Sequence, residues 1–146
     1  MVSGRSRGTA AHIDASSRSP VSVIHLDTSF LIQSLQAGSP ESERLEAWTQ
    51  ANERFAMSAV AWTEFLCGRL DSTAVSLATV IVDRRIDYTA EVAGLAAQLF
   101  NGTGRRRNSL ADCMIAATAI AEDAPIATSN PRDFSRFEAH GLTVHG

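Results

Sequence analysis

The sequence predicts an α/β domain built on a small parallel sheet with helices on both of its faces. The 146 residues match the size of one domain, and a hydrophobic content of 45% is enough for a buried core. Short apolar runs rich in β-branched residues alternate with segments of helical periodicity. Strands that alternate with helices in this way form parallel sheets, because each crossover helix packs back onto the sheet.

The predicted elements follow one another with short connections. Strands are expected at 21–26, 54–58, 125–129 and 142–145, with a connector or very short strand at 84–89. Helices are expected at 28–35, 40–53, 59–69, 72–82, 90–100 and 109–123. Ser39, Ser58 and Ser109 stand where N-caps are expected. The segment "NPRDF" (130–134) is expected to form a loop or turn.

Residues 1–20 are rich in Ser, Gly, Arg and Ala and lack periodicity. We expect them to be a disordered extension, or the product of a start assigned too far upstream, and we place the folded domain at 21–146. No apolar run approaches the roughly 18 residues of a membrane span, and the N-terminus lacks the apolar core of a secretory signal. The two cysteines have no zinc-site spacing, so a reducing, cytoplasmic location is predicted.

The charge balance limits the partners of this chain. The formal net charge is -3 and every basic side chain is an arginine. Bulk charge therefore excludes a protein that coats nucleic acid, and a polyanion must be bound by a local basic patch or through metal ions.

Acidic side chains fall where the predicted strands end. Asp27 follows the first strand, Glu64 lies in the helix after the second, and Asp112 lies near the start of the 109–123 helix. Asn130 and Asp133 follow the third strand. Ligands gather at the carboxyl ends of parallel strands, so we expect these oxygen donors at one edge of the sheet.

Each acid also has a purely structural explanation. Asp27 could cap the helix that follows, Asp112 could form a capping box with Ser109, and Glu64 could lie on a solvated stripe. Capping does not explain why all of them should lie at the same end of the sheet. Clustered carboxylates repel one another, and Mg²⁺ or Mn²⁺ would remove this conflict because both prefer oxygen ligands. Such an ion can orient a water molecule for attack on a phosphodiester.

Four segments resemble, in order, the signature segments of PIN-domain ribonucleases: "VIHLDTSFLI", "SAVAWTEFLCG", "SLADCMIAATA" and "IATSNPRDF". The resemblance is closest to the VapC toxins of bacterial VapBC toxin–antitoxin modules, and it covers residues 23–144. It implies a three-layer α/β/α sandwich that cleaves RNA, such as tRNA or rRNA, with Mg²⁺ or Mn²⁺. It also implies a homodimer that a cognate VapB-like antitoxin silences.

The resemblance assigns roles to particular residues. It implies that Asp27, Glu64 and Asp112 are the catalytic acids, with Asp27 and Asp112 as metal ligands. It also implies a supporting hydroxyl from Thr28 or Ser29. Asn130 departs from the family pattern, because this position often holds a fourth acid. Asn130 is expected to hold a water, and Asp133 either supplies the missing charge or caps a turn.

Arg105, Arg106 and Arg107 precede the helix that contains Asp112. They are expected either to contact RNA phosphates or to form a solvated loop that anchors acidic residues of the antitoxin.

Two other enzyme classes fit the residues less well. A phosphotransferase that uses Asp27 as the nucleophile usually needs an acid two residues later and a lysine, whereas Ser29 stands there and lysine is absent. A P-loop NTPase is excluded, because no G-x-x-x-x-G-K-[ST] motif occurs. The alternative that stays open is a catalytically weak binding module of the same fold, whose acidic pocket docks a basic protein partner.

Overall fold

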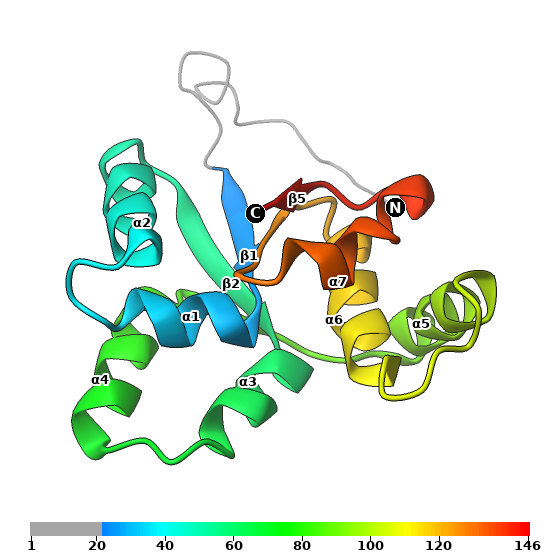
Figure 1. Ribbon diagram of the computed structural model, residues 1–146, viewed down its shortest axis with the longest axis horizontal. Helices are drawn as coiled ribbons and strands as arrows, with labels where there is room; N and C mark the ends of the chain where they lie inside the picture. Colours follow the sequence, from blue (N-terminus) through cyan, green and yellow to red (C-terminus); the bar gives the residue numbers. More distant parts are fainter. Residues whose placement is uncertain (1–21) are drawn as a thin grey trace, which may run out of the picture.

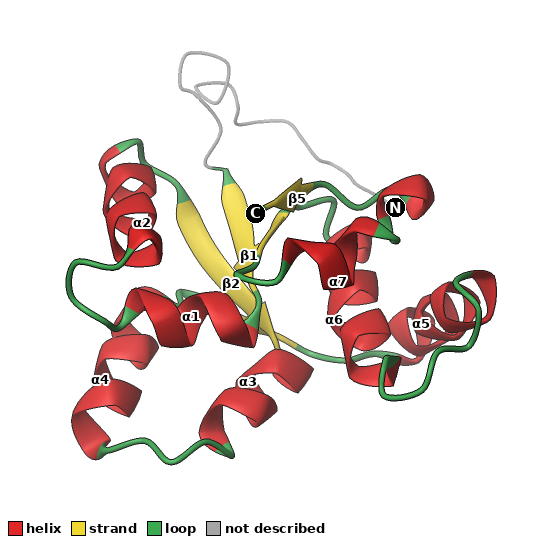
Figure 2. Cartoon of the chain, in the orientation of Figure 1, coloured by secondary structure: helices red, strands yellow, loops and turns green. Residues whose placement is uncertain are grey.

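The computed structural model describes residues 22–146, which form a five-stranded parallel sheet in the order β3-β2-β1-β4-β5 (Figure 2). The strands are β1 (Val23–Leu26), β2 (Arg54–Ser58), β3 (Arg84–Ile86), β4 (Ile126–Ala127) and β5 (Val144–His145). The first of these strands, β1, lies in the middle of the sheet, so each later strand is added at one side or the other. The expected disordered extension, residues 1–20, lies outside the described residues.

Seven α-helices surround the sheet. They are α1 (Thr28–Ser34), α2 (Pro40–Gln50), α3 (Ala59–Leu66), α4 (Ser72–Ile81), α5 (Ala90–Gly102), α6 (Leu110–Ala121) and α7 (Pro131–Ser135), and the 3-10 helix η2 (Glu138–His140) follows α7. Figure 1 shows α1, α2 and α4 on one side of the sheet and α5 and α6 on the other. The predicted three-layer α/β/α sandwich with a small parallel sheet is confirmed. In the part of the chain that the structure describes, no helix has the length and apolarity needed to span a lipid bilayer.

The core depends on apolar strands and on one alanine-rich helix. Ile24 and Leu26 of β1 are buried together with Phe55 and Met57 of β2. Helix α6 packs tightly because its buried positions are mostly small, namely Cys113, Ile115, Ala116, Ala117, Thr118 and Ala119. Small side chains let a helix approach its neighbours closely, and this fixes the position of the first turn of α6, which contains Asp112.

Most of the predicted elements are present, and the exceptions have local causes. The prediction of a loop or turn at 130–134 is wrong, because Pro131–Ser135 forms the helix α7. Asn130 occupies the N-cap position and Pro131 the first turn, where a fixed φ favours a helix and the missing N–H costs nothing. The strand predicted at 125–129 is shorter than expected, because β4 ends at Ala127. The hydroxyls of the next two residues, Thr128 and Ser129, bond to the side chains of Asp27 and Glu41, although the N–H of Thr128 still donates to the carbonyl oxygen of His145 on β5.

His25 lies in the centre of the sheet and is 2% exposed. Its Cα pairs with Ala56 on β2 and Ile126 on β4, so main-chain strands enclose it on both sides. Within the described residues its Nε2 atom has no hydrogen-bond partner. Burial, and secondarily the positive charge of Arg84, lower the pKa of His25 from 6.5 to about 4. His25 is therefore a neutral core residue at neutral pH.

The free energy of unfolding should fall as the pH drops from 6.5 to about 4, because the unfolded chain binds a proton at His25 that the folded chain excludes. A pKa that changes from 6.5 to about 4 corresponds to a loss of about 3 kcal/mol. Urea unfolding over this pH interval checks the prediction. The variant His25→Gln should lack this contribution, and an identical pH dependence in both proteins would contradict the prediction.

Candidate active site

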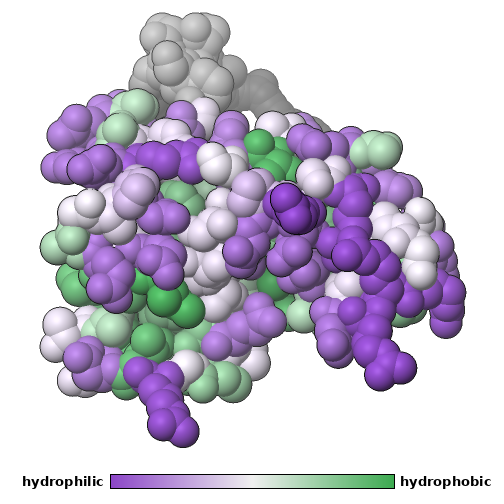
Figure 3. Space-filling model, in the orientation of Figure 1, coloured by the Kyte–Doolittle hydropathy of each residue, from purple (hydrophilic) through white to green (hydrophobic). Residues whose placement is uncertain are grey.

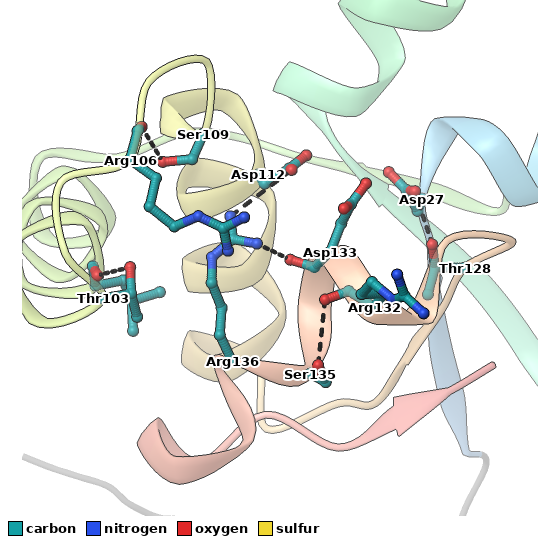
Figure 4. Close-up of polar contacts among 11 residues, drawn as sticks. Asp27, Thr103, Arg106, Ser109, Asp112, Thr128, Arg132, Asp133, Ser135 and Arg136 are labelled. Atoms are coloured by element: carbon teal, nitrogen blue, oxygen red, sulfur yellow. Dashed lines mark hydrogen bonds and ion pairs between the residues drawn. The ribbon is translucent and has the colours of Figure 1, made fainter.

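Acidic side chains from four segments meet at the carboxyl edge of the sheet. Asp27 follows β1, Glu64 lies on α3, Asp112 lies in the first turn of α6 and Asp133 in the first turn of α7. Figure 4 shows the carboxyl groups of Asp27, Asp112 and Asp133 turned toward one common space. The sequence separations are large, so the fold rather than any local motif brings these acids together.

Asp27 is the most buried of these acids, at 6% exposure. Its Oδ2 accepts hydrogen bonds from the hydroxyls of Ser29 at 2.8 Å and Thr128 at 3.0 Å. Burial raises the pKa of Asp27, and these two hydrogen bonds act in the opposite direction. Asp27 occupies the N-cap position of α1, yet its side chain makes no capping hydrogen bond. The capping explanation for Asp27 is therefore wrong.

Thr28 and Ser29 support different acids. The hydroxyl of Ser29 donates to Asp27, whereas the hydroxyl of Thr28 lies 3.1 Å from Oε1 of Glu64 and 3.0 Å from the carbonyl oxygen of Ala61. Thr28 thus connects the start of α1 to α3 and holds Glu64 on the side of α3 that faces Asp27. Glu64 is exposed, but it does not lie on an isolated solvated stripe.

Asp112 is surrounded by like charges. Burial, and then the charge of Asp27, raise the pKa of Asp112 from 3.8 to about 6, and Asp133 and Glu64 add smaller effects in the same direction. The Arg136 guanidinium, 3.8 Å from Oδ2 of Asp112, lowers this pKa. The capping box with Ser109 does not form, because the Ser109 hydroxyl donates to the carbonyl oxygen of Arg106 at 2.6 Å.

The loop between β4 and α7 supplies residues that the sequence did not single out. Thr128 bonds to Asp27, and its hydroxyl also accepts the N–H of Asn130 at 2.9 Å. The hydroxyl of Ser129 donates to Glu41 on α2 at 2.7 Å, and its N–H donates to the Ser29 hydroxyl at 3.1 Å. A threonine directly after a buried strand, at the edge where Asp27 lies, was the available signal for Thr128.

Asn130 and Asp133 occupy different positions relative to the acids. Asn130 is exposed at the N-cap position of α7, and its side chain makes no capping hydrogen bond. Asp133 is close enough to raise the pKa of Asp112. Of the two residues expected to complete the site, Asp133 is the one that acts on the other acids.

The three consecutive arginines lie in the loop between α5 and α6, and all three are exposed. Arg105 lies against the end of α5: its guanidinium donates to Oδ1 of Asn101 and lies 5.3 Å from the ring centroid of Phe100. Figure 3 shows strongly hydrophilic surface over α7 and the tip of this loop, and hydrophobic surface over α1 and α4. Arg106 and Arg107 are therefore better placed than Arg105 to bind an anion.

The donor set fits a divalent cation in ligand type and charge. All four acids offer oxygen atoms. Burial first, and then the charge of Asp27, raise the pKa of Asp112, and a cation would relieve the second, like-charge effect. Asp27 and Asp112, with Glu64 and Asp133 beside them, are the residues that could hold Mg²⁺ or Mn²⁺. Among residues 22–146, however, no three His, Cys, Asp or Glu side chains are close enough to coordinate one ion. The acids face one another without forming a closed ligand cage.

An α/β sandwich with clustered acids at the carboxyl edge of a parallel sheet defines a class of candidate metal-dependent hydrolases. A family model of the PIN domain matches residues 24–139, so the chain belongs to the PIN-domain family. The comparison with curated proteins gave no match.

Solved structures of toxin–antitoxin proteins share the fold. VapBC2 from Rickettsia felis, bound to a DNA fragment from its promoter, is 19% identical with a TM-score of 0.67, covering 84% of this chain and 97% of that chain. A toxin–antitoxin complex from Klebsiella pneumoniae is 23% identical with a TM-score of 0.66, covering 84% and 96%. VapC20 from Mycobacterium tuberculosis, a sarcin–ricin loop cleaving toxin, is 19% identical with a TM-score of 0.59, covering 82% and 96%. At these identities the likeness establishes the fold.

The pKa of Asp112 should fall from about 6 in the variant Asp27→Asn, because the largest like-charge contribution is removed. Burial of the Asp112 carboxyl group remains, so its pKa should stay above 3.8. Carbon-13 NMR of the aspartate carboxyl groups measures both values. Asp123→Asn, an exposed change beyond the other end of α6, is the matched control. An unchanged pKa in Asp27→Asn would show that the two acids do not interact.

Proposed function

We propose that this chain is a metal-dependent endoribonuclease and the toxin of a toxin–antitoxin pair. The observation that supports the proposal best is the cluster of Asp27 and Asp112, two desolvated acids whose pKa values are both raised. Such a cluster costs folding free energy. Acids with perturbed pKa values are typical of functional sites, where that cost is retained for the activity. The PIN-domain match and the toxin structures of the same fold agree with this proposal.

In this proposal Asp27 and Asp112 would hold Mg²⁺ or Mn²⁺, which when bound would supply a polarised water and neutralise negative charge on the phosphodiester. Ser29 and Thr128 fix the orientation of the Asp27 carboxylate through its Oδ2 atom. Thr28 holds Oε1 of Glu64, and the Glu64 carboxylate would serve as the base that takes a proton from the attacking water. The bond between phosphorus and the 3′ oxygen would break, the 3′ oxygen would take a proton from solvent, and the RNA products would carry a 5′-phosphate and a 3′-hydroxyl.

The comparisons with solved structures also support a proposed substrate and a proposed partner. A structured RNA such as rRNA or tRNA is the proposed substrate, because VapC20, which shares the fold, is a sarcin–ricin loop cleaving toxin. A VapB-like antitoxin is the proposed partner, because related folds occur in toxin–antitoxin complexes. We further propose that the chain forms a homodimer and acts in the cytoplasm, where such RNA is found.

One observation favours a second function. The acids do not form a ready-made metal cage among residues 22–146, and the exposed Asn130 stands where a fourth acid is often found. The site could instead be an acidic pocket that docks a basic protein partner without catalysis. Binding of Mn²⁺ to the purified chain separates the two functions, because a docking pocket needs no divalent cation.

Asp27→Asn and Asp112→Asn should each lower the rate of RNA cleavage by at least about 100-fold, because each removes a ligand charge from the metal site. Cleavage in Mg²⁺ or Mn²⁺, with end analysis of the products, measures the effect, and chelation should abolish wild-type cleavage. The control Asp123→Asn should cleave at the wild-type rate. Products with 2′,3′-cyclic phosphate ends would rule out attack by water.

Arg106→Gln and Arg107→Gln should weaken RNA binding and flatten its salt dependence. For single-stranded RNA the slope of log K against log salt should decrease by about 0.7 for each phosphate that an arginine no longer neutralises. Arg105→Gln should change the slope less, because Arg105 is held by Asn101 and Phe100. Fluorescence anisotropy with a catalytically inactive variant measures the slopes. Equal slopes in all variants would exclude this loop from phosphate binding.

A further inference from the structure

Arg136 directly follows α7, and its side chain lies between α6 and α7 (Figure 4). The side chain is 14% exposed, and its Nη2 atom lies 3.8 Å from Oδ2 of Asp112. Its Nη1 atom donates to the backbone carbonyl of Asp133, and its guanidinium carbon lies 4.4 Å from the ring centroid of Phe137. A single cation thus contacts one acid of the cluster and the backbone of another.

The burial of Arg136 is not explained by stability alone. Its Nε atom is buried and lacks a hydrogen-bond partner within residues 22–146. The 3.8 Å distance from Nη2 of Arg136 to Oδ2 of Asp112 is also too long for a hydrogen bond. Desolvation of a cation with incomplete bonding costs free energy, and an apolar side chain would often stabilise such a position better. The charge therefore serves the acids beside it.

We propose that Arg136 is a positioning residue that holds Asp112 and the backbone of α7 in the orientation that the metal site requires. The inference rests on the proposed function. Arg136 acts through Asp112 and through the α7 backbone at Asp133, so that both carboxyl groups face the common space before an ion binds. It is not a phosphate contact, because its side chain is only 14% exposed and is directed at acids, whereas Arg106 and Arg107 are exposed.

Titration of the purified chain with Mn²⁺, without RNA, tests the proposal by calorimetry. Charge alone predicts that Arg136→Gln binds Mn²⁺ more tightly, because a competing positive charge is removed. A positioning role predicts the opposite, and we expect binding about 10-fold weaker. Arg136→Lys keeps the charge but cannot contact both partners with one planar group, so it should recover only part of the affinity.

The matched control is Arg84→Gln, which removes another arginine–acid pair next to α6. Arg84 lies 3.7 Å from Glu122, the residue that follows α6, and both side chains are more exposed than that of Arg136. This control should bind Mn²⁺ as the wild type does. In RNA cleavage, Arg136→Gln should lower kcat with little change in KM, as expected for a residue that acts through the metal site.

Wild-type or tighter Mn²⁺ affinity in Arg136→Gln would overturn the inference, and so would a raised KM with unchanged Mn²⁺ affinity. If Arg136→Gln does not fold, the comparison of Arg136→Lys with wild type decides, and full wild-type affinity would again overturn the inference. A wild-type chain that neither binds Mn²⁺ nor cleaves RNA would instead overturn the proposed function itself.

Discussion

Desolvation of carboxylates at the end of the central strand is the constraint on which the site depends. Asp27 is buried because β1 lies in the middle of the sheet, between β2 and β4. Burial, and then the charge of Asp27, raise the pKa of Asp112, which approaches from α6. A carboxylate in this position is costly, and hydroxyl groups offset only part of the cost. The surrounding structure can be understood as a means of holding repelling groups together.

Hydroxyl side chains do most of this holding. Ser29 and Thr128 share one oxygen of Asp27, although they are far apart in sequence. The hydroxyl of Thr28 likewise lies within hydrogen-bond distance of Oε1 of Glu64. The bond from Thr128 to Asp27 also connects the β4–α7 loop with the start of α1, and the bond from Thr28 to Glu64 connects α1 with α3. The same hydrogen bonds therefore orient the acids and attach the helices to the carboxyl edge of the sheet.

The sequence predicted the fold well because its signals are local and strong. β-Branched apolar runs and capping residues such as Ser39 and Ser58 stand where the elements begin. The helix α7 was missed because Asn130 and Pro131 are as typical of turns as of helix starts, and only packing of Phe134 against the core decides between them. Asp27 was found because it directly follows a strand, and Glu64 and Asp112 were found because they are acids in otherwise apolar helical segments.

The sequence could not predict which side chains contact the acids. The sequence places Thr128 directly after a strand but does not identify the acid that it contacts, and Arg136 carries no signal at all. These contacts run from the residue after β4 to Asp27 and from the residue after α7 to Asp112 on α6. The choice between Asn130 and Asp133 likewise depends on the direction in which α7 leaves the sheet. Long-range geometry of this kind becomes visible only when the elements are assembled.

The outermost strand on one side of the sheet has a consequence for self-association. β3 has three residues, of which Arg84 and Arg85 are charged and exposed. Another chain that extended the sheet at this edge would have to strip water from both guanidinium groups, and charged, short edge strands are how proteins discourage such pairing. Pairing of two copies through this edge is therefore disfavoured, which leaves this side of the sheet in contact with solvent.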